Sequence, residues 1–356
     1  DEIPVAEIKA TNTELFDIAC PINKGHYTRT ALLGMIAARQ AIGQAGLEKN
    51  ELHTAALISG TTVGGMDQSE VFFKNFLANN NHGKIREVAG HDCGDSTEMI
   101  AREMGVQGFL STINTACSSS ANAIMMGARL IRQGKLKKAV AGGTDCLTKF
   151  TLNGFNSLMI LDRMQCKPFD DNRNGLNLGE GSAFVVLESE EDVKQSGKTP
   201  LAEVLGFGNA CDAYHQTASS PEGLGAYLAM KIALETAGIT SSQISYINTH
   251  GTGTKNNDLS EGVAIERLFG NDIPHCSSTK SFTGHTLGAA GAIEAVISTL
   301  AIRNQCIFAN LNFSDKMQEL SFLPVQKFMP DAQINYVMSN SFGFGGNNSS
   351  LIFSRI

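Results

Sequence analysis

Short apolar segments alternate with helix-like stretches along most of this chain. Five of these segments have the length and composition of strands that are covered on both faces: 55–59, 109–114, 138–141, 183–188 and 245–249. Strands that alternate with helices form parallel or mixed sheets flanked by helices, so the pattern predicts an α/β fold with a largely buried sheet. With 356 residues, 42% of them hydrophobic, the chain can form a large core and more than one domain-sized unit.

Glycine-rich turns follow many of these segments. The glycines cluster at Gly64-Gly65, Gly142-Gly143, Gly179-Glu180-Gly181, Gly251-Thr252-Gly253 and 343–346. Such turns allow close backbone approaches and predict a site at the strand ends. A hydrophilic stretch at 188–200 separates two apolar parts. We therefore expect an N-terminal half at 1–200 and a C-terminal half at 201–356.

Charge and composition argue against several classes of protein. The 28 Lys and Arg residues against 35 Asp and Glu residues give a net charge of -7, which argues against a nucleic-acid platform. No segment reaches the roughly 20 apolar residues that span a bilayer, and 1–10 lacks a signal-peptide pattern, so we expect a cytoplasmic protein without membrane contact. The eight cysteines show no zinc-like spacing, which predicts reduced thiols and no metal site.

One cysteine lies where a strand is followed by a helix. Cys117 lies among small residues between the strand-like segment 109–114 and the helical pattern at 121–132. This position is close to the positive end of the helix dipole, which favours the thiolate, and the small neighbours leave room for a substrate. Cys117 is therefore a candidate nucleophile. An ordinary buried cysteine is the alternative, and the turn alone leaves the two interpretations about equally supported.

Two histidines occupy comparable positions in the C-terminal half. His250 comes directly after a buried strand and begins a Gly-Thr loop, and His285 precedes a helix of small residues. Two neutral imidazoles can donate hydrogen bonds to one carbonyl oxygen and so stabilise an enolate. Either histidine alone would more often be structural, but the combination with Cys117 favours a catalytic set.

Lys280 lies five residues before His285, and Glu294 lies nine residues after it. A buried lysine needs a carboxylate partner, so Lys280 and Glu294 are expected to form an ion pair that sets the field around the histidines. A solvated surface lysine is an equally supported alternative.

A glycine loop at 339–348 lies between two apolar strands. Such a loop can expose backbone N–H groups, and the amides of Phe344 and Cys117 would form an oxyanion hole. The loop has neither of the glycine patterns that bind nucleotides, which argues against a nucleotide site.

Together these segments resemble the elongating β-ketoacyl-acyl carrier protein synthases of the thiolase-like superfamily, over nearly the whole chain. The matching motifs are Asn114-Thr-Ala-Cys117-Ser-Ser, Pro168-Phe-Asp-Asp-Asn-Arg-Asn-Gly175 with Gly179-Glu-Gly181, Asn248-Thr-His250-Gly-Thr, Lys280-Ser-Phe-Thr-Gly-His285 with Gly288-Ala-Ala-Gly291, and Ser339-Asn-Ser-Phe-Gly-Phe-Gly-Gly346. The second histidine is typical of elongating enzymes, since initiating synthases have asparagine there and thiolases have a second cysteine.

The resemblance implies a role for each matching residue. The family's nucleophile falls on Cys117, its catalytic histidines on His250 and His285, its conserved lysine on Lys280, the lysine's carboxylate partner on Glu294, and its oxyanion hole on the amides of Cys117 and Phe344. The remaining matches concern the substrate: Thr252 and Thr254 match threonines that meet the phosphopantetheine arm, and Val63 resembles a residue that borders the acyl pocket.

The resemblance also implies a thiolase-like fold, in which two related halves form five αβαβα layers, and normally a homodimer with strands paired across the twofold axis. The implied reaction joins an acyl group on Cys117 to the enolate that malonyl-acyl carrier protein forms on losing carbon dioxide, in fatty-acid or polyene and polyketide elongation. It needs no cofactor beyond the phosphopantetheine of acyl carrier protein.

Several departures from the family pattern bear on these expectations. The Gly-rich first strand of the family is missing before 1–10, so the numbered chain is expected to start inside the natural protein or to be a short member. Asn174, Gly253 and Asn347 replace more usual residues, which leaves the acyl substrate open. An inactive chain-length partner subunit is the main alternative function, although such partners lack the cysteine. A thioester hydrolase would need a water-activating base.

An acidic carrier protein is expected to seek basic patches on this acidic chain. The candidates are Lys24 with Arg29, and a cluster of Arg129, Arg132, Lys135, Lys137 and Lys138. A solvated helix face explains the cluster equally well.

Overall fold

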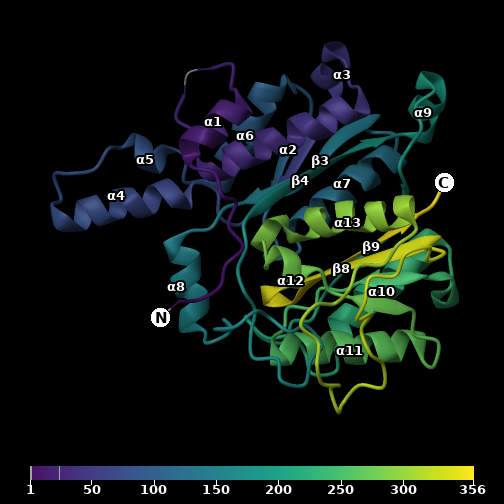
Figure 1. Ribbon diagram of the computed structural model, residues 1–356. Helices are drawn as coiled ribbons and strands as arrows, with labels where there is room; N and C mark the ends of the chain where they lie inside the picture. Colours follow the sequence, from purple (N-terminus) through teal and green to yellow (C-terminus); the bar gives the residue numbers. More distant parts are fainter. Residues whose placement is uncertain (1, 24) are drawn as a thin grey trace.

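Two mixed β-sheets lie on either side of a pair of central helices, and further helices cover both outer faces (Figure 1). The computed structural model describes residues 2–23 and 25–356. The resulting five layers confirm the predicted α/β class and the thiolase-like fold.

The first sheet has the strand order β2-β1-β3-β4. Its strands are β1 (Ala56–Gly60), β2 (Leu110–Ile113), β3 (Lys138–Asp145) and β4 (Gly181–Glu188). The β2-β1 and β1-β3 pairs are parallel, and β4 is antiparallel to β3.

The second sheet has the strand order β5-β9-β8-β6-β7. Its strands are β5 (Glu203–Cys211), β6 (Tyr246–Asn248), β7 (His275–Ser277), β8 (Tyr336–Gly343) and β9 (Asn347–Ser354). The β7-β6 and β6-β8 pairs are parallel, and β9 is antiparallel to β8 and to β5. Two parallel pairings followed by an antiparallel one therefore occur in both sheets, which relates the two halves. Within the described residues, β9 pairs with β5 on its other side, whereas β4 ends its sheet.

The helices form three layers. The central pair is α7 (Ser119–Arg132) and α13 (Ala290–Asn304), and the outer layers contain α1 (Asn12–Ala19), α2 (Arg29–Ala45), α3 (Lys49–Thr54) and α6 (Cys93–Met104) on one side and α10 (Leu224–Ala237) and α11 (Lys255–Phe269) on the other. Shorter helices lie in the connections: α8 (Lys149–Ser157), α9 (Glu190–Ser196), α12 (Lys280–Thr283), and the 3-10 turns η1 (Ser241–Gln243), η2 (Leu287–Ala289) and η3 (Phe344–Gly346). An arm of α4 (Met66–Ala78) and α5 (Arg86–Ala89) projects from the layered body (Figure 1).

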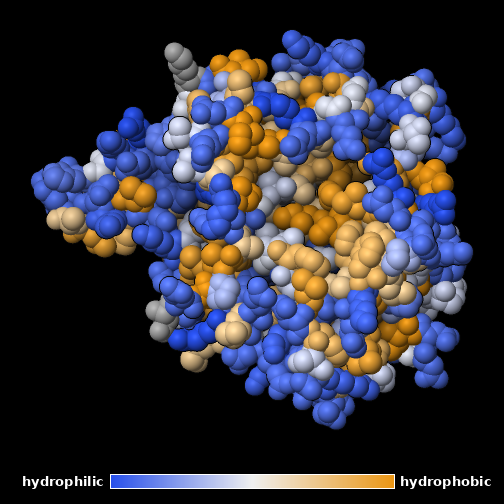
Figure 2. Space-filling model, in the orientation of Figure 1, coloured by the Kyte–Doolittle hydropathy of each residue, from blue (hydrophilic) through white to orange (hydrophobic). Residues whose placement is uncertain are grey.

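The central core explains why α7 and α13 lie between the sheets. Ile124 on α7 and Ala295 on α13 are fully buried together with Ile58 of the first sheet and Val337 of the second. These helices have apolar or small residues on more than one face because each contacts both sheets. On the face shown in Figure 2, apolar residues gather over α13, where Leu300 is 39% exposed.

All five predicted strands are present, with one difference in burial. The segment 109–114 forms β2, but Phe109 and Leu110 are exposed because β2 is an edge strand and is not covered on both faces. Among the described residues, none of the helices is both long and apolar enough to cross a membrane.

Candidate active site

Cys117 lies in a tight turn between β2 and α7. The preceding residue, Ala116, has a φ of 52°, in the left-handed region that L-residues rarely adopt. The hydroxyls of Ser118 and Ser119 donate to the carbonyls of Thr115 and Ala116 at 2.8 and 2.6 Å. These bonds hold the sulfur just before the first residue of α7.

The end of β8 approaches this turn closely. A Cβ atom on Gly343 would lie 3.0 Å from the Cys117 backbone nitrogen, so only glycine fits there without a shift. The next amide, that of Phe344, acts to lower the pKa of the Cys117 thiol. The Phe344 ring stacks on Phe155 with centroids 5.7 Å apart. Gly343 thus brings the backbone before Phe344 close to Cys117, and the oxyanion hole stays a prediction.

The two predicted histidines meet Cys117 in the interior. The Cys117 sulfur, one ring nitrogen of His250 and one ring nitrogen of His285 all lie within 4.8 Å of one another. The imidazoles are edge to face, with ring centroids 5.3 Å apart. Cys117 is 7% exposed, and each histidine is 2% exposed. Residues that are far apart in the sequence thus form one buried thiol-imidazole cluster.

Backbone contacts fix the position of His285. Its N–H donates to the Asn177 carbonyl at 2.7 Å, and its carbonyl accepts from the Gly179 N–H at 3.0 Å. Its ring nitrogen Nδ1 accepts from the Leu287 N–H at 3.0 Å. An Nδ1 that accepts a hydrogen bond has no proton, so the neutral ring carries its proton on Nε2.

Burial and charge keep both imidazoles neutral. Burial first, and then the positive charge of Lys280, lower the pKa of His285 to about 3. The same two causes, with a smaller effect of His285, hold the pKa of His250 well below its usual value. Neutral rings at pH 7 can donate a hydrogen bond without first losing a proton.

The expected effect of the helix dipole on Cys117 is outweighed by burial. Burial raises the pKa of the Cys117 thiol to about 11, although the Phe344 amide and Lys280 act in the opposite direction. Removing the sulfur from water thus destabilises the charged form more than its neighbours stabilise it, and the role of Cys117 as nucleophile stays a prediction.

Lys280 and Glu294 form a buried ion pair beside the cluster. Lys280 begins α12, Glu294 lies on α13, and their side chains are 2% and 3% exposed. Burial raises the pKa of Glu294, and the charge of Lys280 opposes this rise. The alternative of a solvated surface lysine is thus excluded.

Comparison with known families agrees with this geometry. The family model of the β-ketoacyl synthase N-terminal domain matches residues 6–193, and that of the C-terminal domain matches residues 201–314. The chain belongs to the β-ketoacyl synthase family. It is a ketosynthase of the elongating kind and hence an acyltransferase.

Individual relatives support the same conclusion. The 3-oxoacyl-[acyl-carrier-protein] synthase 2 of Coxiella burnetii is 38% identical over 339 residues, which cover 90% of this chain and 81% of that protein. The Staphylococcus aureus (strain COL) protein of the same name is 34% identical over 333 residues, with 90% and 80% covered.

Solved structures of ketosynthases superpose closely on this one. The ishigamide ketosynthase/chain length factor matches with a TM-score of 0.93 and 31% identity, covering 98% of this chain and 87% of that one. A Xenorhabdus doucetiae ketosynthase, solved in complex with its chain length factor, matches with a TM-score of 0.84 and 34% identity, covering 99% and 87%.

The residues predicted to contact the substrate lie in two loops of this ketosynthase. Thr252 and Thr254 lie on either side of Gly253, with hydroxyls 2.9 Å apart, and Thr254 caps α11. Val63 is buried in the loop after β1 and lies outside the Cys-His-His cluster. Its N–H donates to Asp145 at 3.0 Å.

Three buried carboxylates of this ketosynthase were not singled out from the sequence. Glu261 accepts from the N–H groups of His250 and Gly251 at 2.9 and 2.8 Å, and burial raises its pKa to about 7. Asp258 accepts from the N–H of Thr252 at 2.9 Å. The third is Asp145. The sequence did contain a sign of Asp258 and Glu261. They lie three residues apart near the start of the helix that follows the Gly-Thr loop, and this spacing places both on the helix face near that loop.

The predicted basic patches are largely engaged within the molecule. Lys24 lies outside the described residues, and Arg29 forms an ion pair with Glu180. Arg129 and Arg132 lie over the Phe207 ring at 5.5 and 4.9 Å.

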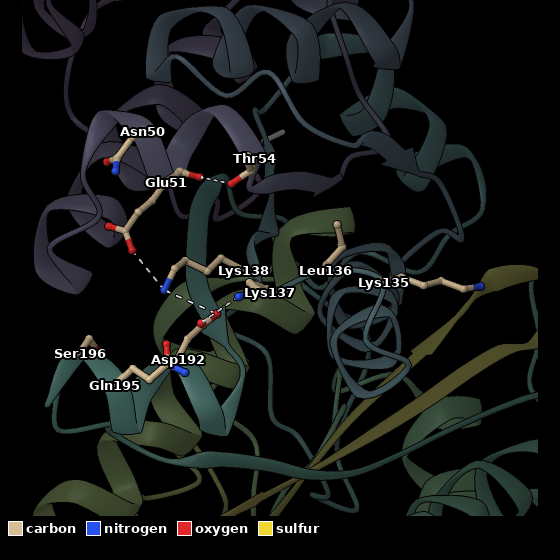
Figure 3. A pocket seen from close by; sticks show the side chains of 10 residues that line it. All are labelled: Asn50, Glu51, Thr54, Lys135, Leu136, Lys137, Lys138, Asp192, Gln195 and Ser196. Carbon is tan, nitrogen blue, oxygen red and sulfur yellow. Dashed lines mark hydrogen bonds and ion pairs between the residues drawn. The ribbon is translucent and has the colours of Figure 1, made fainter.

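Lys138 is likewise engaged, as Figure 3 shows, because it points toward Glu51 and Asp192, and it also pairs with Glu188. Lys135 and Lys137 are exposed. Together with Lys138 they line the surface groove drawn in Figure 3. Lys137 also pairs with Asp192 at 3.8 Å, although its side chain is 78% exposed.

Proposed function

We propose that this ketosynthase holds an acyl chain on Cys117 and condenses it with malonyl-acyl carrier protein. The cluster of one thiol and two neutral imidazoles within 4.8 Å carries this proposal. In acyl transfer, the Cys117 sulfur attacks the thioester carbonyl, the bond to the carrier sulfur breaks, and the thiol proton leaves on the carrier thiol. The amides of Cys117 and Phe344 stabilise the tetrahedral oxyanion.

Condensation uses the histidines. The malonyl carboxylate leaves as carbon dioxide, and its bonding electrons form an enolate whose oxygen accepts hydrogen bonds from His250 and His285. The enolate carbon attacks the acyl carbonyl, the carbon-sulfur bond breaks, and the Cys117 sulfur is released as a thiolate, which takes up a proton from water. Each donor to a developing oxyanion contributes about 3 to 4 kcal/mol in comparable sites. The Lys280 charge beside both rings adds to this stabilisation.

The substrate arm and acyl pocket belong to the same proposal. Thr252 and Thr254 are proposed to contact phosphopantetheine, and Val63 to border the acyl chain. We propose that the nucleophile half ends near residue 200 and that the histidine half follows it. A metal-free site and a cytoplasmic location remain predictions. Zinc accepts cysteine and imidazole ligands, so elemental analysis of the purified protein would test the metal-free site.

A homologous subunit is the proposed partner besides acyl carrier protein. Phe109, directly before the edge strand β2, and Leu110, its first residue, are 43% and 40% exposed, and the arm carries exposed Phe73 and Leu77. An exposed apolar edge strand is a template for pairing with another chain. Native mass spectrometry distinguishes a homodimer from a complex with a chain-length subunit, and a purely monomeric protein would contradict the proposal.

The reaction is tested with purified acyl- and malonyl-acyl carrier proteins. We expect release of carbon dioxide together with a β-ketoacyl thioester two carbons longer than the acyl donor, roughly one equivalent of each per condensation. An inactive partner subunit would give neither product, and a hydrolase would give free acid without carbon dioxide.

A further inference from the structure

Asp145 is a fully buried carboxylate at the end of β3 that has no role in the chemistry described above. Its oxygens accept from the hydroxyl and N–H of Thr62 at 2.7 and 3.0 Å, the Thr61 hydroxyl at 2.6 Å, the Val63 N–H at 3.0 Å and the Gly288 N–H at 2.7 Å. Every one of these groups is a donor, which suits an ionised, acceptor-only carboxylate. Asp145 thus joins two loops that are far apart in the sequence.

Glycines bring these loops together. A Cβ on Gly143 would lie 2.6 Å from the Gly60 carbonyl oxygen and 3.3 Å from that of Gly288. A Cβ on Gly288 would lie 2.8 Å from Asp145 Oδ2. The ends of β1 and β3 and the turn after His285 can therefore approach only because side chains are missing there.

The turn after His285 needs such support. Leu287 has a φ of 52°, which is unfavourable for leucine and persists only where surrounding contacts fix it. The Leu287 N–H donates a hydrogen bond to His285 Nδ1, and the next N–H, that of Gly288, donates one to the Asp145 carboxylate. Two successive amides thus connect the carboxylate to the imidazole.

We propose that Asp145 is a positioning residue, which fixes the turn after His285 so that the imidazole keeps its proton on Nε2, and which ties this turn to the loop of Val63. The proposal rests on the proposed function of His285 as a donor to the enolate. Without the carboxylate, the Leu287 amide can move away from Nδ1, the ring can adopt the other tautomer, and the donor toward the substrate is lost. Acylation of Cys117 does not depend on this donor.

The test compares three proteins by ¹⁵N NMR of labelled histidine, with His285 assigned through His285→Ala. Asn has nearly the same shape as Asp, but in Asp145→Asn an NH₂ group replaces a carboxylate oxygen and faces N–H and O–H groups that need an acceptor. The control Glu103→Gln changes a carboxylate that is 4% exposed and whose hydrogen bonds go to residues 22–27. We expect an unprotonated Nδ1 in the wild type and the control, and a mixture of tautomers in Asp145→Asn. Malonyl decarboxylation should fall by about 10- to 100-fold in Asp145→Asn alone, as for a misplaced catalytic group, with acylation of Cys117 retained.

A second variant keeps the test possible if Asp145→Asn does not fold. Gly288→Ala keeps the carboxylate and the N–H of residue 288, but its Cβ would lie 2.8 Å from Asp145 Oδ2 and 3.1 Å from the Thr62 nitrogen. The turn must therefore move away from Asp145, which should produce the same tautomer mixture. Unchanged His285 signals in whichever of these variants folds would overturn the proposal. The NMR result does not depend on activity. A wild-type protein that does not catalyse condensation would therefore refute the proposed function, while the tautomer of His285 would still test the role of Asp145.

Discussion

Replacing Lys280 with alanine separates the electrostatic role of the ion pair from its structural role. The change leaves the Glu294 carboxylate, whose side chain is 3% exposed, without its counter-charge. Breaking a buried pair in this way costs about 3 to 5 kcal/mol of unfolding free energy. It also removes the nearest positive charge from both histidines, so we expect decarboxylation to fall strongly.

The loss of stability in Lys280→Ala depends on pH with a definite sign. Burial raises the pKa of Glu294 above the ordinary value of 4.5, and removing Lys280 raises it further. Above the wild-type pKa of Glu294, the folded variant keeps a proton that the folded wild type and the unfolded chain have released, so its stability relative to wild type falls as the pH rises past that raised pKa. Below it both folded proteins are protonated and the loss shrinks.

The matched control is the double variant Lys280→Met with Glu294→Gln. It removes both charges at similar volume, so its stability should return to within about 1 kcal/mol of wild type. Carbon dioxide release should not return, because the field at the histidines is still missing. The chain has no tryptophan, so urea unfolding is followed by far-UV circular dichroism. Wild-type stability and wild-type carbon dioxide release in Lys280→Ala would refute the reasoning.

Three further predictions concern the thiol and the imidazoles. Cys117→Ala should keep the thermal unfolding midpoint and lose acylation and condensation, and an acylated variant would remove Cys117 as nucleophile. His250→Ala and His285→Ala should each retain acylation and lose about 10²- to 10³-fold in malonyl decarboxylation, and the opposite pattern would reverse the assigned roles. Iodoacetamide labelling of Cys117 should rise about tenfold per pH unit and level off near pH 11, where its pKa lies, whereas a plateau near pH 8 would show an activated thiolate.

Local sequence patterns predicted much of the fold. The strand before His250 is recognisable because 245–249 is apolar and ends at a glycine loop, and it forms β6 in the middle of a sheet. The pattern does not show which strands are edges. Phe109 and Leu110 look like buried residues in the sequence, and their exposure follows from the position of β2 at the sheet edge.

The sequence predicted which residues form the site more fully than it predicted their pKa values. Strand-end positions and the family resemblance singled out Cys117, His250 and His285, but spacing alone does not place three distant residues within 4.8 Å. The raised pKa of Cys117 depends on how completely the fold removes the sulfur from water, which local sequence does not encode. Buried carboxylates such as Asp145 resemble any acidic residue until tertiary structure surrounds them with donors.

Intact-protein mass spectrometry tests the central claim most directly. The ketosynthase is mixed with acyl-acyl carrier protein, then with malonyl-acyl carrier protein, and the acyl adduct is located by peptide mapping. We predict one acyl group per chain, on Cys117, that disappears on addition of the malonyl substrate as the β-ketoacyl product forms. An adduct on another residue, or a Cys117 adduct that the malonyl substrate leaves in place, would contradict the account.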